Sequence, residues 1–83
     1  MKRVIESKYF ENTKANHFKF YEVIETVDNG VFEVVGVYGR IGSSSKKDVK
    51  YRGVKAERAA KALAEVTQTR FNHGYELLDK KSA

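Results

Sequence analysis

Hydrophobic and polar positions alternate along most of residues 1–54, a pattern typical of β-strands. Polar or glycine-containing breaks divide this region into four strand segments, 3–10, 17–25, 31–41 and 47–54. The Asp28-Asn29-Gly30 break is the most specific, because Asn-Gly readily adopts the positive φ angles of a two-residue hairpin turn. The segments on either side of it are therefore expected to pair antiparallel.

The alternation also assigns side chains to faces. In segment 17–25, Phe18, Phe20 and Ile24 share one face, while Tyr21 and Val23 occupy the other. Both faces carry apolar side chains, so we expect both to be partly covered.

The next two segments form a second predicted hairpin around the polar residues 42–45. Segment 47–54 is predicted to place Val49 and Tyr51 on one face. Gly36 within segment 31–41 indicates a bulge, a close backbone approach, or simply a weak point in the strand. One face of segment 31–41 then holds Phe32, Val34, Gly36, Tyr38 and Arg40, and the other holds Val35, Val37 and Ile41.

After residue 54 the apolar residues recur about every 3.6 positions instead of every second position, which predicts a helix over residues 55–72. Gly74 marks its end, since glycine suits the left-handed position that follows a helix. Its start lacks a capping side chain, and Gly53 is the only plausible cap. Residues 75–78 then form a final short strand. The apolar stripe of the helix contains Ala56, Ala59, Ala60, Leu63, Val66, Thr67 and Phe71.

These elements predict an α+β fold, a small antiparallel sheet of about five strands with one packed helix. The chain has 83 residues, of which 41% are apolar, enough for one modest core. We expect a single domain over residues 1–83, with residues 1–2 and 80–83 frayed.

The sequence lacks the residues that several classes of function require. The chain has no cysteine, and its two histidines, His17 and His73, lie in different elements, so we expect no metal site and no cofactor. No nucleophile is placed beside a base, so we expect no catalytic residue and no enzyme activity. The first residues lack the apolar core of a signal peptide, and no segment is long enough to span a bilayer. We expect a soluble, cytoplasmic protein without membrane contact.

The net charge of +5 is concentrated in one segment. Residues 1–39 hold five basic and six acidic side chains, residues 40–61 eight and two, and residues 62–83 three and three. A basic segment between nearly neutral ones indicates a surface for an anionic partner.

Tyr38 and Arg40 begin this segment and point the same way on one strand. A ring can stack on a base or sugar, and a guanidinium can bind a phosphate or a base edge. The alternative is that Tyr38 fills the core, Arg40 lies on the surface and the lysines form a solvated edge. Likewise, Ser43 to Ser45 either bind phosphate or form a flexible tip. The predicted nucleic-acid-binding residues are Tyr38, Gly39, Arg40, Lys46, Lys47, Lys50, Arg52, Lys55 and Arg58.

The run Tyr38-Gly39-Arg40-Ile41-Gly42 resembles the signature of WGR domains, the Trp-Gly-Arg modules of poly(ADP-ribose) polymerases and of bacterial proteins. The resemblance covers nearly the whole chain: residues 18–22 are similar to the family's aromatic strand, residues 55–72 to its helix, and Tyr75 to its closing aromatic residue. Tyr38 stands where the family has tryptophan. A phenol stacks with less area than an indole.

The resemblance implies a small antiparallel sheet with one packed helix, and contact with DNA ends or breaks through Tyr38 and Arg40. Free-standing versions of the domain are typical of bacteria. We therefore expect a nucleic-acid-binding module that recognises DNA, or RNA, by phosphates or ends with little sequence preference. The alternative is a regulatory module that docks on a larger protein partner.

Overall fold

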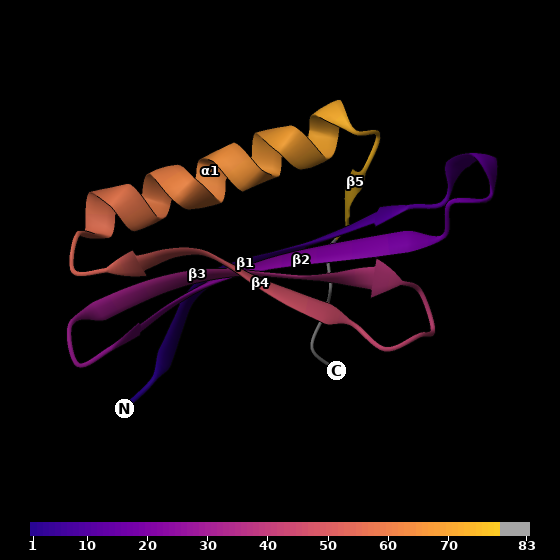
Figure 1. Ribbon diagram of the computed structural model, residues 1–83. Coiled ribbons are helices and arrows are strands. Elements are labelled where there is room, and N and C mark those ends of the chain that lie inside the picture. The colour runs from indigo at the N-terminus through magenta and orange to yellow at the C-terminus, as the bar shows by residue number, and fades with distance from the viewer. Residues whose placement is uncertain (79–83) are drawn as a thin grey trace.

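The computed structural model describes residues 1–78, which form a five-stranded antiparallel sheet and one long helix (Figure 1). The sheet order is β4-β3-β2-β1-β5. The predicted α+β class and its single packed helix are confirmed. The elements are β1 (Arg3–Asn12), the 3₁₀ turn η1 (Lys14–Asn16), β2 (Lys19–Asp28), β3 (Val31–Arg40), β4 (Lys46–Gly53), α1 (Ala56–Asn72) and β5 (Glu76–Leu78). The predicted fraying of residues 80–83 lies outside the described residues.

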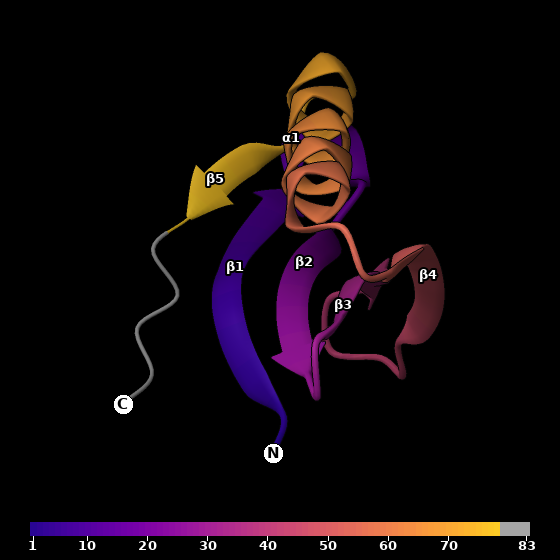
Figure 2. The same ribbon diagram turned by 90° about the vertical axis from the view of Figure 1, so that its left-hand side faces the viewer.

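Helix α1 lies across one face of the twisted sheet, and no other described element covers the opposite face (Figure 2). We call this opposite side the open face. The core forms between helix and sheet, where Phe10, Val23 and Val34 from three neighbouring strands are fully buried against Ala59 and Leu63 of the helix. Removal of this apolar surface from water is what holds the helix on the sheet.

The Asn29-Gly30 turn has the predicted conformation, with φ of 51° and 78°. It pairs Asp28 with Val31 and sets the register of the whole β2-β3 hairpin. The same register brings Lys19 opposite Arg40 at the far end of the two strands.

Strand β2 begins two residues later than predicted, at Lys19. Phe18 lies outside the strand with φ of 45° and is 44% exposed, so its predicted place on a strand face is wrong. Within β2, Tyr21 and Val23 are the buried pair that faces the helix. Phe20 is only half-buried.

Gly36 marks a close approach between a side chain and the backbone. A Cβ at this position would overlap the phenol oxygen of Tyr21 and lie 2.7 Å from its Cζ. The phenol end of the Tyr21 ring therefore occupies the space that a side chain at residue 36 would need, which glycine leaves open.

A bulge interrupts β4 at Lys50. Val49 pairs with Val35, but Tyr51 pairs with Val34, so one extra residue is inserted between them. Val34 and Val35 point to opposite faces, and Val49 and Tyr51 therefore do so as well, contrary to the prediction that they share a face. Tyr51 packs on the core, whereas Val49 is 52% exposed on the open face.

The helix ends where predicted and begins one residue later. Gly74 has φ of 84°, and its N–H donates to the carbonyl of Phe71. At the start, Lys55 is the N-cap and makes no side-chain capping bond, so the assignment of Gly53 as the cap is wrong. The Lys55 N–H instead donates to Tyr51 Oη at 3.2 Å.

Candidate nucleic-acid interface

The turn that follows β3 folds the chain back over the end of the strand. Gly42 has φ of 87°, which suits the third position of a type II turn, and the Ser43 N–H donates to the Arg40 carbonyl at 3.0 Å. A Cβ at Gly39 would lie 3.1 Å from the carbonyl oxygen of Ser44. Gly39 thus lets the tip of the hairpin lie close to β3.

A cleft of about 380 Å³ opens beneath this hairpin tip. Its lining contains three basic side chains, two tyrosines, two serines and one glycine, and no acidic residue of the described part of the chain, residues 1–78. Such a lining offers cationic and hydroxyl groups to an anion and ring faces to a base or sugar. The cleft is formed by Lys19, Tyr38, Gly39, Arg40, Ser43, Ser44, Lys46 and Tyr75.

The two tyrosines of the cleft belong to a larger aromatic stack. Tyr38 stacks on the buried Tyr21, with ring centroids 5.7 Å apart and an interplanar angle of 12°. The guanidinium of Arg70 lies 4.2 Å from the Tyr21 ring centroid and 5.2 Å from that of Tyr75. Tyr38 therefore packs against the core and also lines the cleft, and its contact with nucleic acid stays a prediction.

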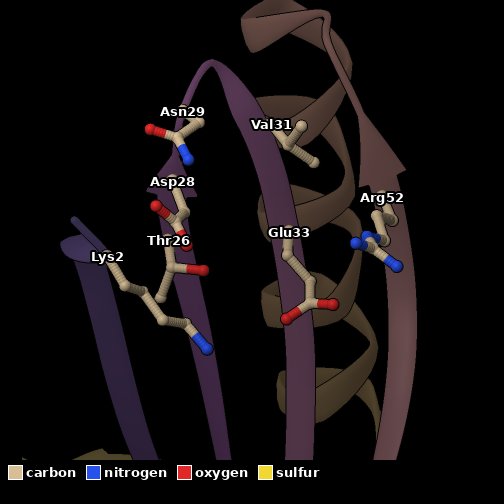
Figure 3. Close-up of a pocket in the computed structure, with 7 residues that line it drawn as sticks. All are labelled: Lys2, Thr26, Asp28, Asn29, Val31, Glu33 and Arg52. Atoms are coloured by element: carbon tan, nitrogen blue, oxygen red, sulfur yellow. The ribbon is translucent and has the colours of Figure 1, made fainter.

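Two of the predicted basic residues lie on the open face, away from the cleft. Lys47 pairs with Val37 and Arg52 pairs with Glu33, both on strand positions that point away from the helix. Figure 3 shows Arg52 beside Glu33 on this face, with the helix behind the strands.

Arg52 also borders a shallow depression of about 440 Å³ on the open face (Figure 3). The charges there are mixed, because Lys2 and Arg52 are accompanied by Asp28 and Glu33. An anionic chain would meet both attraction and repulsion at this depression. The cleft, where no described acidic residue takes part in the lining, is the more favourable of the two for an anion.

The remaining predicted residues are also separated from the cleft. Lys55 and Arg58 lie at the start of α1, close to the β2-β3 turn, whereas Tyr75 follows the other end of the helix (Figure 1). The 17-residue helix is about 25 Å long, so these groups are at opposite ends of the molecule. Lys50 borders a separate small hollow beside the aromatic stack.

A model of the WGR domain family matches residues 6–82. This chain belongs to the WGR domain family. No curated protein and no solved structure gives a significant match. WGR domains are small modules that are not themselves catalytic, and in poly(ADP-ribose) polymerases they bind nucleic acid.

In this WGR domain the cleft also contains residues outside the predicted nucleic-acid-binding set. Lys19 was missed, although the two-residue Asn29-Gly30 turn sets a register that places it opposite Arg40. Ser43 and Ser44, for which the sequence leaves phosphate binding and a flexible tip open, both line the cleft. Tyr75 was noted only for its family resemblance.

The described part of the WGR domain offers neither a metal site nor a membrane-spanning helix. Over residues 1–78, the structure brings together no group of three His, Cys, Asp or Glu side chains that could hold a metal ion. In the same part of the chain, helix α1 lacks the length and apolar character needed to cross a membrane.

Proposed function

We propose that this WGR domain is a non-enzymatic module that binds nucleic acid, DNA in the first instance, through the cleft beneath the β3-β4 hairpin. The observation that carries the proposal is the lining of the cleft, in which Lys19, Arg40 and Lys46 accompany two tyrosines and, among residues 1–78, no acidic side chain takes part. Phosphates neutralise the cations while a sugar or base covers the rings.

The geometry favours contact with the backbone or a strand end over sequence readout. The cleft lies at the tip of a hairpin, and none of its lining residues belongs to α1, so it presents no helix to a major groove. Low sequence preference follows, because phosphate contacts position a protein on DNA without specifying bases.

The test is the salt dependence of binding to labelled DNA. Three phosphate contacts from the basic residues of the cleft predict a slope of about −3 in a plot of log affinity against log salt. Arg40→Ala should weaken binding roughly tenfold and reduce the slope by about one. Arg52→Ala is the matched control, since it removes the same charge from the open face.

Unchanged affinity in Arg40→Ala, or equal losses in both variants, would contradict the assignment of the cleft. Absence of binding at low salt would contradict the function itself. Blunt, nicked and single-stranded DNA and RNA should be titrated in parallel, because they differ in the ends and unpaired bases offered to Tyr38 and Tyr75.

A second candidate function, docking on a protein partner, is favoured by the open face. Val49 is 52% exposed there and pairs with Val35, which is buried within the same face. Capture of one specific protein that survives nuclease treatment and is lost in Val49→Asp, but not in Arg40→Ala, would favour this function over the first.

A further inference from the structure

A small hollow of about 120 Å³ lies between β4 and α1, next to the aromatic stack but outside the cleft. The bulge in β4 places the extra residue, Lys50, at its border, consistent with the way bulges redirect a side chain. The hollow is lined by Tyr21, Lys50, Glu65, Val66, Thr69 and Arg70.

Two buried polar atoms on residues that line this hollow have no hydrogen-bond partner within residues 1–78. They are Tyr21 Oη and Arg70 Nε, and the Tyr21 residue is only 4% exposed. Buried polar groups are almost always satisfied in native proteins, so two such atoms beside one hollow point to an occupant.

The chemistry of the lining specifies that occupant. Arg70 Nε–H can only donate, and the Lys50 ammonium adds further donors at the border. Burial raises the pKa of Tyr21, although Lys50 and Arg70 oppose the rise, so its phenol keeps its proton and can donate as well. Three donors of this kind call for an acceptor with several lone pairs and a negative charge.

The groups that oppose an anion are few. The Glu65 side chain is at the exposed border, and Asp48 lies 2.7 Å from the Lys50 ammonium, which leaves that ammonium further hydrogens to donate. Thr69 already donates its hydroxyl to the Glu65 carbonyl. A single water molecule could accept from Tyr21 Oη and Arg70 Nε, whereas an oxyanion can accept from both and also from the Lys50 ammonium.

We propose that this hollow is an oxyanion site, in which Tyr21 Oη, Arg70 Nε and Lys50 Nζ together bind a phosphate-type oxyanion. The oxyanion comes either from free inorganic phosphate or from a nucleic-acid backbone. The site shares the Tyr21-Tyr38 stack with the cleft but none of its lining residues, and it does not depend on DNA binding by the cleft.

The experiment follows the Arg70 Nε–H signal in ¹H–¹⁵N spectra of the full chain during titration with inorganic phosphate at constant ionic strength. The signal is assigned by its disappearance in Arg70→Lys. We expect the chemical shift to change saturably with phosphate concentration. The affinity obtained from this titration should be at least about tenfold weaker in Tyr21→Phe, which keeps the ring and removes the hydroxyl donor. Tyr9→Phe is the matched control, because Tyr9 lies in a different stack, with Phe20.

A second variant tests the sign of the electrostatics. Glu65→Gln should strengthen phosphate binding roughly two- to fivefold, because it removes a negative charge from the border. Arg40→Ala should leave phosphate binding unchanged while weakening DNA binding, so that failure of the cleft and failure of this site are distinguishable.

The same Arg70 Nε–H signal is also followed during titration with duplex DNA at low salt. A shift with DNA but not with inorganic phosphate, again lost in Tyr21→Phe, assigns the site to the nucleic-acid backbone. A linear, non-saturating response that is the same in the wild type and Tyr21→Phe, with both phosphate and DNA, would overturn the proposal and leave water as the occupant.

Discussion

Gly36 is a position with no room for a side chain, and its substitution tests the packing of the aromatic stack. A Cβ there would overlap the Tyr21 phenol oxygen and lie 2.7 Å from Cζ. The ring has little freedom to move, because Tyr38 stacks on it and the guanidinium of Arg70 lies 4.2 Å from its centroid. Gly36→Ala should therefore destabilise the fold.

The magnitude follows from two opposing effects. Overpacking a well-packed core costs about 1–3 kcal/mol. Replacing a strand glycine by alanine stabilises by about 0.5–1 kcal/mol, because the unfolded chain loses conformational freedom. The net loss for Gly36→Ala is about 1–2 kcal/mol, which lowers Tm by roughly 4–15 °C in a domain of this size.

The assay is urea and thermal unfolding of the wild type, Gly36→Ala, Tyr21→Leu and the double variant, which form a double-mutant cycle. Tyr21→Leu removes the ring and keeps an apolar side chain. The cost of Gly36→Ala should shrink by at least about 1 kcal/mol in the Tyr21→Leu background. An unchanged or higher Tm for Gly36→Ala, or the same cost in both backgrounds, would refute the close approach as the reason for glycine.

Three further predictions concern single side chains. Burial, and to a smaller extent the charge of Glu6, raises the pKa of Glu25 above its ordinary value of 4.5. The folded state therefore disfavours the ionised carboxylate, and the stability of the fold falls as the pH rises from 4.5 through the higher pKa of the folded state. Glu25→Gln should raise Tm at pH 7 and lose that advantage below about pH 4, as measured by thermal unfolding across pH. Asn29→Ala should lower stability by about 1–2 kcal/mol in urea unfolding, because Asn29 has φ of 51°, and a gain in stability would contradict the turn. Burial and the hydrogen bond to Glu11 raise the pKa of Tyr9 to about 12, and Glu11→Gln should bring its absorbance titration back toward 10.0, whereas no change would show that the carboxylate has no influence.

Features controlled by neighbouring residues could be predicted from the sequence. The Asn29-Gly30 hairpin and the end of the helix before Gly74 depend on backbone preferences of one or two residues, and both have the expected positive φ angles. Alternation likewise placed Tyr38 and Arg40 on one face of a strand, and the cleft brings them together.

Features controlled by distant contacts could not be predicted. Both faces of β2 are apolar, so the pattern alone did not show that Tyr21, and not Phe20, packs under the helix. The start of the helix could not be predicted either. The Lys55 N–H donates to the Tyr51 hydroxyl, and this contact depends on how β4 approaches the helix.

The bulge at Lys50 explains why one of the predicted basic residues, Arg52, lies apart from the cleft. In an unbroken strand, Lys46 and Arg52 would lie on the same face, six residues apart with a period of two. The extra residue reverses this parity, so Lys46 remains at the cleft while Arg52 turns to the open face. Nothing in the local sequence marks the bulge, and charge counting alone therefore overestimates the basic surface on one side.

The aromatic stack also gives the molecule a built-in optical reporter. The chain contains five tyrosines and no tryptophan, so tyrosine dominates its intrinsic fluorescence. Tyr38 and Tyr75 line the cleft, and both rings contact the buried Tyr21. A ligand that enters the cleft changes the emission of the rings it touches, and occupancy can be followed in the unlabelled, unmodified protein.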